Sequence, residues 1–157
     1  MLLLSVLFGG FAFSAAPAVD QIAGVYKKQF ENGTIDGHGY HSENILELVK
    51  YSDKALYFRV HLDFFNGHVC NAHGIAGASG ETFQFRDKHY GCELEISRSE
   101  KEVVLRDVSD GNCQAYCGSR GSLSEVKFEL AKKRKIRYLP VVLKSREYRQ
   151  AVKDFEK

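Results

Sequence analysis

The sequence predicts an all-β fold, a small antiparallel β-barrel of about eight strands followed by a C-terminal amphipathic helix. Residues 55–65 alternate strictly between apolar and polar side chains, the period of a strand with one buried face. Asn66-Gly67 follows, a dipeptide that favours a hairpin because both residues tolerate positive φ. Further short alternating runs recur as far as Leu130, separated by Gly-rich turns, which is typical of a barrel or a sandwich.

The N-terminal stretch, residues 1–18, has the pattern of a secretory signal peptide. Residues 1–13 are apolar or small and uncharged, and SAA (14–16) and APA (16–18) are small-residue cleavage sites. The usual positive n-region is missing, so either the start is truncated or the signal is atypical. A membrane anchor is disfavoured because a span needs roughly 20 apolar residues. The other alternative to a signal peptide is that these residues form a buried N-terminal strand or helix of the folded domain.

The first strands flank a Gly-rich loop. Residues 22–30 (IAGVYKKQF) predict a strand, residues 31–42 a loop, and residues 44–51 (NILELVKY) a second strand. The alternating strand at 55–65 has two faces. One carries Leu56, Phe58, Val60, Leu62 and Phe64, and the other carries Tyr57, Arg59, His61 and Asp63. After the Asn-Gly turn, residues 68–78 return as its partner.

The remaining strands are short. We expect them at residues 82–86, 92–97, 102–108 and 125–130, with turns between them and a loop at 109–112. One barrel domain over residues 19–130 accounts for all the strand patterns. Closure of the sheet would remove exposed edges.

The C-terminal segment, residues 131–157, differs in charge from the rest. It has ten Lys/Arg against three Asp/Glu, a net charge of +7, whereas the rest has twelve against seventeen, a net charge of −5. Tyr148, Ala151, Val152 and Phe155 share one helical face, which predicts the amphipathic helix. The basic segment from Lys132 to Lys157 is a candidate for contact with a membrane surface.

The four cysteines, in an exported chain, predict two disulfides. Four cysteines allow three pairings. We favour Cys70–Cys92 with Cys113–Cys117, and the alternative crosses Cys70 or Cys92 to the later pair. Three residues separate Cys113 from Cys117, whereas a redox-active pair usually has two. A structural role is therefore expected.

Catalytic and metal-binding motifs are not recognisable, so the sequence predicts a protein that is not an enzyme and needs no cofactor or metal. The loop serines lack a nucleophile elbow. His68 and His73 are an odd number of residues apart and so face opposite sides of a strand. Export and the lack of an aromatic-interleaved basic sheet argue against nucleic acid as a partner.

The sequence around the four cysteines resembles that of a known group of proteins. NGHVC (66–70), GIA (74–76), CELEI (92–96) and NCQAYCGSRG (112–121) resemble a pattern of exported proteobacterial proteins, some of which carry it beside a lysozyme-inhibitor-type region. The resemblance covers roughly residues 24–130 and does not extend into the C-terminal segment. It implies a Gram-negative periplasmic protein. The barrel predicted from the strand pattern is of a lipocalin-like or inhibitor-like kind.

The leading functional hypothesis is a periplasmic binding protein that inhibits or neutralises a cell-wall (peptidoglycan) hydrolase, as a lysozyme inhibitor or an immunity protein. An acidic body would steer a basic enzyme toward it. We expect partner contacts from two loops, at Asp36, His38, His41, Gln114, Tyr116 and Arg120. The alternatives are a carrier of a small apolar ligand, and an envelope scaffold held at a membrane by the basic segment.

Overall fold

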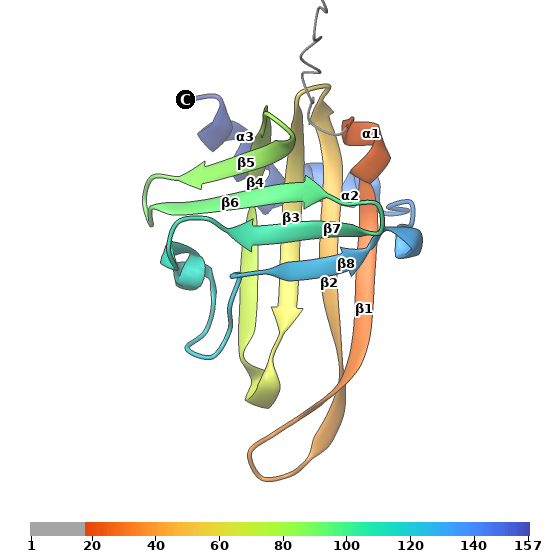
Figure 1. Cartoon of the computed structure of the whole chain (residues 1–157), viewed down its shortest axis with the longest axis vertical. Coiled ribbons are helices and arrows are strands. Elements are labelled where there is room, and N and C mark those ends of the chain that lie inside the picture. The colour runs from red at the N-terminus through yellow and green to blue at the C-terminus, as the bar shows by residue number, and fades with distance from the viewer. Residues whose placement is uncertain (1–17) are drawn as a thin grey trace, which may run out of the picture.

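The computed structural model describes residues 18–157, and its single sheet contains eight antiparallel strands in sequence order. Figure 1 shows the first four strands running across the last four, so that the sheet curls into a nearly closed barrel. The predicted small all-β barrel with a C-terminal helix is confirmed. The predicted signal peptide lies outside the described residues, except for Ala18.

Short turns connect most of the elements. The strands are β1 Gly24–Gly33, β2 Gly39–Ser52, β3 Ala55–Asp63, β4 Val69–Ser79, β5 Thr82–Asp87, β6 Cys92–Arg98, β7 Glu102–Asp107 and β8 Val126–Glu129. The α-helices are α1 Val19–Ile22, α2 Leu139–Lys144 and α3 Arg146–Phe155. Three 3₁₀ turns are η1 Phe65–Gly67, η2 Asn112–Tyr116 and η3 Leu130–Lys132.

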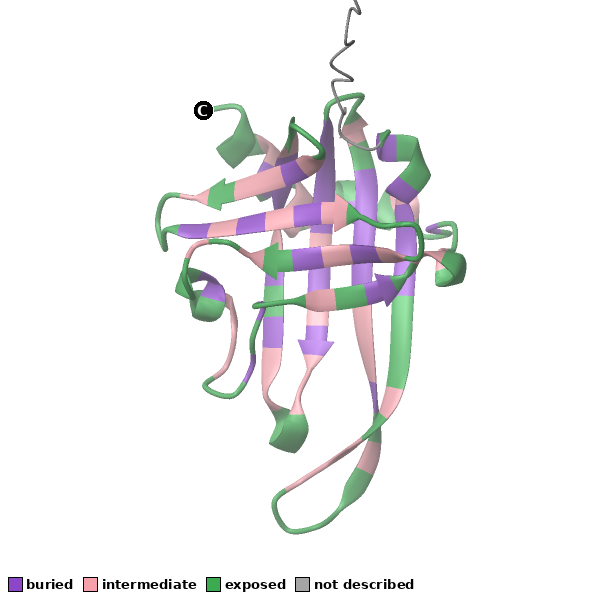
Figure 2. Ribbon diagram, in the orientation of Figure 1, coloured by how far each residue is buried: buried purple, intermediate pink, exposed green. Residues whose placement is uncertain are grey.

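The barrel interior is filled by side chains. The alternation of β3 places Leu56, Phe58, Val60 and Leu62 inside, each at most 1% exposed, and Figure 2 shows the buried positions alternating along the strands. Phe85 packs edge-on against Phe58 with ring centroids 5.1 Å apart. A Cβ on Gly74 would lie 2.3 Å from the Phe85 ring, so only glycine fits there.

The barrel is closed on one side and open on another. After β8 the chain returns to β1, where Val25 donates to the Arg134 carbonyl at 2.8 Å and Arg134 donates back at 2.9 Å. Between β4 and β5, in contrast, pairing covers only Gly77 to Ser79. The first four strands therefore diverge from the rest at this corner.

The predicted loop at residues 31–42 is wrong, because most of it is strand. β1 and β2 stay paired to Gly33↔Gly39, and only residues 34–38 form the turn. The outer part of this hairpin has largely exposed residues on both faces. It therefore lacks the apolar alternation from which a strand is recognised.

The Asn-Gly turn is longer than a two-residue hairpin. Asn66 and Gly67 do adopt positive φ, 59° and 72°. However, β3 ends at Asp63 and β4 begins at Val69, so five residues connect them, with Phe64 donating to the His68 carbonyl at 2.7 Å. The prediction of the turn residues is correct, and that of the strand ends is off by one or two residues.

The two predicted disulfides are present, but the favoured pairing is wrong. Cys70 bonds Cys117 and Cys92 bonds Cys113, which is a crossed alternative. Each bond ties the segment around η2 to a different strand, β4 through Cys70 and β6 through Cys92. The segment thus spans the open corner between β4 and β5, and both disulfides hold it there.

The C-terminal helices form a second layer on the outer face of β2, β3 and β4. Ser145 caps the N-terminus of α3, and its hydroxyl accepts from the Tyr148 amide at 3.1 Å. The Tyr148 ring packs on Tyr57 with centroids 5.0 Å apart, and Phe155 packs on Tyr51 at 5.7 Å. Tyr57, on the polar face of the alternating strand, is therefore fully buried.

A buried ionic cluster lies under the start of α2. Glu47, in β2, is 2% exposed and accepts hydrogen bonds from Arg59 in β3 and from the Tyr138 hydroxyl. The bond to Glu47 holds the pKa of Arg59 above its ordinary value. Burial, followed by the hydrogen bond to Glu47, raises the pKa of Tyr138 to about 12. This cluster anchors the C-terminal segment to the barrel.

His73 makes the stability of this layer depend on pH. It lies on β4 opposite Arg59, within the fields of Glu147 and Asp154 of α3, and burial lowers its pKa below the ordinary 6.5. The contribution of His73 to stability is therefore fully present above pH 6.5 and is lost as the pH falls through the folded pKa.

We expect wild type to lose more stability than His73→Gln between about pH 7.5 and about pH 5.5, measured as the midpoint of urea unfolding. His89→Gln, at an exposed turn, is the control and should behave as wild type. An equal loss in wild type and His73→Gln would assign the pH dependence to other groups.

Candidate binding surface

The β1–β2 hairpin projects beyond the end of the barrel (Figure 1). Its turn is closed by backbone hydrogen bonds from Thr34 to the His38 carbonyl, 2.9 Å, and from Gly37 to the Thr34 carbonyl, 3.0 Å. The Thr34 hydroxyl also contacts the Asp36 carboxylate and donates to the His38 carbonyl at 3.1 Å. The tip of the hairpin is thus ordered by its own polar groups.

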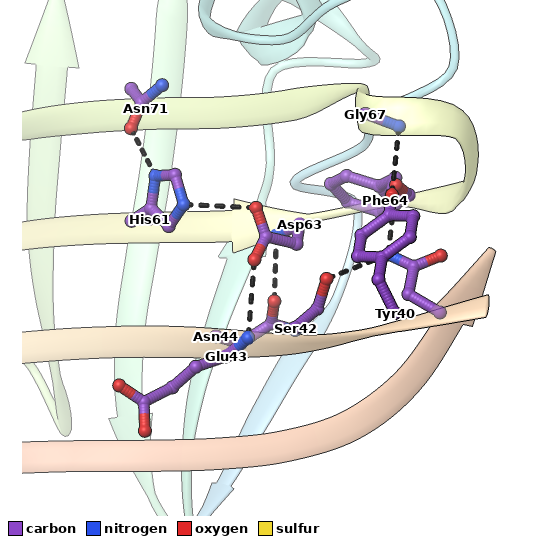
Figure 3. Close-up of polar contacts among 10 residues, drawn as sticks. Tyr40, Ser42, Glu43, Asn44, His61, Asp63, Phe64, Gly67 and Asn71 are labelled. Carbon is purple, nitrogen blue, oxygen red and sulfur yellow. Dashed lines mark hydrogen bonds and ion pairs between the residues drawn. The ribbon is translucent and has the colours of Figure 1, made fainter. Parts of the chain in front are cut away.

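The hairpin is braced against the neighbouring η1 turn. Asn32 donates to the Phe64 carbonyl at 3.1 Å, and the Ile35 amide donates to Asn66 Oδ1 at 3.2 Å. The Gly67 amide donates to the Tyr40 hydroxyl at 3.1 Å, as Figure 3 shows. Because these bonds are distributed along the hairpin, its outer part is held in one orientation relative to the barrel.

A polar network fixes the base of the hairpin (Figure 3). Asp63 accepts from the Glu43 amide at 3.2 Å, and its own amide donates to Asn44 Oδ1 at 2.8 Å. His61 bonds Asp63 through Nε2 at 3.1 Å and Asn71 through Nδ1 at 2.7 Å. Both ring nitrogens are engaged by protein groups, so this His–Asp pair serves as a structural clamp across β2, β3 and β4.

A third loop, residues 117–121, lies against the same turn. Gly118 donates to the Val69 carbonyl at 2.8 Å, and a Cβ on Gly118 would lie 3.3 Å from His68 Nδ1. A Cβ on Gly121 would lie 2.7 Å from Cys70 Sγ and 3.3 Å from the Phe64 ring. We call residues 31–41, 64–68 and 117–121 together the hairpin-end surface.

Two exposed apolar side chains distinguish this surface. Ile35, at the hairpin tip, is 75% exposed, and Phe65 is 49% exposed. Carboxylates flank them: Asp36 lies 3.7 Å from His38, and Glu31 lies 2.8 Å from His41. An apolar anchor surrounded by polar groups is the usual anatomy of a protein-binding patch.

The structure places four of the six predicted contact residues on the hairpin-end surface. Asp36, His38 and His41 are exposed on the hairpin, and Arg120 is exposed in the adjoining loop. Gln114 and Tyr116 lie instead in η2. Gln114 donates to the Gly118 carbonyl at 3.0 Å and so supports the loop of Arg120.

Tyr116 acts as a brace for η2. Its hydroxyl donates to Asp87 at the end of β5, and its ring packs on Tyr90 with centroids 5.5 Å apart. Burial, and then the bond to Asp87, raises its pKa above the ordinary value of a tyrosine. The phenol is therefore a neutral hydrogen-bond donor that ties η2 to β5.

Sequence reasoning missed the apolar members of the surface, Ile35 and Phe65. Ile35 is the single large aliphatic residue in the Gly-rich stretch 31–42, a signal that could have been read. The alternating pattern of residues 55–65 places Phe65 in the strand before the Asn-Gly turn. The bracing roles of Asn32, Tyr40 and Asn66 depend on tertiary contacts and have no sequence signal.

A groove lies at the open corner of the barrel. It has a volume of about 830 Å³ and lies between β4, the end of β5 and α3, with Phe85 and Tyr116 among its walls. Its rim carries both signs of charge, from Arg86, Asp87, Lys88, Asp154 and Lys157. Polar and apolar atoms contribute similar shares of the surface that lines the groove.

Within residues 18–157, no group of three or more His, Cys, Asp or Glu side chains is placed to hold a metal ion. In the same part of the chain no helix is long and apolar enough to cross a membrane. Fold and surface together define a disulfide-stapled, eight-stranded barrel with a braced projecting hairpin. No family model, curated protein or solved structure matches the chain. The resemblance to the exported proteobacterial family stays a prediction.

Proposed function

We propose that the protein is a periplasmic binding protein that inhibits or neutralises a cell-wall hydrolase, and that it binds this enzyme through the hairpin-end surface. The observation that carries the proposal is Ile35, 75% exposed at the tip of a hairpin braced by hydrogen bonds at both of its strands. The protein acts by binding and not by catalysis.

The bracing supports the proposal through the entropy of binding. Ordering a mobile loop costs free energy when a complex forms, and a hairpin that is already ordered avoids much of that cost. A narrow projection with an apolar tip also suits an enzyme whose active site is a cleft. The braced hairpin is therefore better suited than a flexible loop to enter such a cleft.

Charge and compartment give further support. The body of the chain, residues 1–130, has a net charge of −5, and Glu31, Asp36 and Asp63 lie at the hairpin end. Such a surface steers a basic enzyme toward itself. The two disulfides are consistent with an oxidising compartment outside the cytoplasm, where cell-wall hydrolases act.

The test is inhibition of purified lysozymes and other peptidoglycan hydrolases by the oxidised protein, read as the rate of cell-wall lysis. Ile35→Asp should weaken inhibition of the sensitive enzyme by about 30-fold or more, the effect of removing a binding hot spot. Val141→Asp is the matched control, because Val141 is an aliphatic residue of similar exposure, 69%, on α2.

If inhibition survives Ile35→Asp, or falls equally with Val141→Asp, the hairpin does not form the contact with the enzyme. If no hydrolase of the panel is bound or inhibited by the wild-type protein, the functional proposal itself fails.

The groove beside β4 favours a second candidate, a carrier of a small ligand. Since the barrel interior is packed, a ligand would have to occupy the groove of about 830 Å³. Native mass spectrometry of the purified protein tests this. A retained small molecule that is lost in Gly77→Phe, which fills the groove, would support the carrier, and an unliganded mass would exclude it.

A further inference from the structure

The segment from Lys132 to Lys144 concentrates positive charge. It contains six cations, and no acidic residue lies between Glu129 and Glu147. In the described chain, Lys132 is the one cation of the segment with an ion pair, to Glu129 at 2.7 Å. The cations are Lys132, Lys133, Arg134, Lys135, Arg137 and Lys144.

The backbone of this segment is fixed on the barrel, and five of its six cations are exposed, whereas Lys133 is half-buried and donates to the Gln21 carbonyl at 2.7 Å. Arg134 pairs with Val25 of β1, Ile136 is 7% exposed, and Tyr138 donates to the buried Glu47. Lys135 and Arg137 lie on either side of the buried Ile136 and are exposed. Because Ile136 is anchored in this way, Lys135 and Arg137 are held on the outside of the barrel.

Apolar side chains adjoin the cations. Val142 is 1% exposed and anchors α2 to the barrel, which turns Val141 to the outside at 69% exposure. Tyr138 and Leu143 are each 39% exposed beside it. Lys144, exposed on the same short helix, places a cation next to these groups.

We propose that residues 132–144 form a docking surface for an anionic lipid bilayer. The exposed cations neutralise lipid phosphates, and Val141 and Leu143 enter the interface between headgroups and acyl chains. A basic surface for a soluble phosphate would gain nothing from exposed aliphatic side chains. The lipid surface explains both the charge and the apolar exposure.

The position of the surface suits this role. Figure 1 shows α2 toward the end of the barrel opposite the hairpin tip. A protein held at a bilayer by this segment would keep the hairpin-end surface free for a partner. The inference does not depend on the hydrolase proposal, since each surface has its own ligand.

The experiment is flotation of the oxidised protein, residues 19–157, with vesicles of phosphatidylcholine alone or mixed with phosphatidylglycerol. We expect binding to the mixed vesicles only, and release at high salt. Lys135→Gln with Arg137→Gln should lower the partition coefficient about 30-fold, since each cation near an anionic surface contributes about 1 kcal/mol. Val141→Asn should also weaken binding.

The matched control is Lys28→Gln with Lys88→Gln, two exposed cations outside the segment that have no ion pair in the described chain. It should change partitioning by less than about threefold. Equal loss in both double variants, binding to phosphatidylcholine alone, or no flotation at all would overturn the proposal. Displacement by inorganic phosphate at equal ionic strength would assign the surface to a soluble anion and overturn it too.

Discussion

Replacing Cys70 and Cys117 together with alanine is expected to lower the free energy of unfolding by about 4 kcal/mol. The bond closes a loop with a sequence separation of 47 residues, and the chain entropy released in the unfolded state grows with loop length. Removing Cys92–Cys113, with a separation of 21 residues, should cost about 3 kcal/mol. Urea unfolding of the two double variants, each retaining the other disulfide, measures both.

A mismatched variant provides the control. Cys70→Ala with Cys92→Ala removes one sulfur from each bond, and leaves Cys113 and Cys117 without their partners. Thiol titration should find no free thiol in either matched variant. The mismatched variant should show two thiols, or a new Cys113–Cys117 bond. A mismatched variant as stable as a matched one would contradict the pairing in the structure.

The number of disulfides was predictable from sequence, whereas the pairing was not. Nearness along the chain favoured Cys113 with Cys117, only four positions apart. The fold separates them because η2 turns between them, so that Cys113 faces β6 and Cys117 faces β4. That arrangement follows from the divergence of β4 from β5, a property of barrel curvature that local sequence does not encode.

The strands were predictable where one face is buried against the core. β3, with Leu56 and Phe58 inside, has a clear period of two. The same logic failed for Tyr57, which was placed on the polar face and is buried under α3. It also failed for residues 31–42, where the hairpin leaves the barrel and neither face is buried as a whole.

The candidate surface was partly predictable for a different reason. Exposed polar residues in Gly-rich loops indicated Asp36, His38 and His41, because loops carry most contacts of small barrels. The turn at residues 64–68 contacts both the β1–β2 hairpin and the loop of Arg120, a tertiary arrangement that the sequence does not show.

The buried cluster under α2 gives the second large effect. Arg59→Leu leaves the Glu47 carboxylate, 2% exposed, with the Tyr138 hydroxyl as its remaining side-chain partner. An unpaired buried charge is costly, and we expect the free energy of unfolding to fall by about 2 kcal/mol. Arg59 is itself 35% exposed, so solvent reaches the cluster and the loss should stay below that of a fully buried pair.

Glu47→Leu combined with Arg59→Leu separates the charge effect from simple loss of packing. Apolar replacement of both partners of a buried ion pair is often neutral or stabilising. The double variant should therefore recover most of the stability that Arg59→Leu loses, since Tyr138, 39% exposed, is able to bond water. If the double variant is as unstable as the single one, packing of the Arg59 side chain and not its charge holds the C-terminal segment on the barrel. The comparison is made by urea unfolding at neutral pH, where Glu47 and Arg59 are both charged in the unfolded chain.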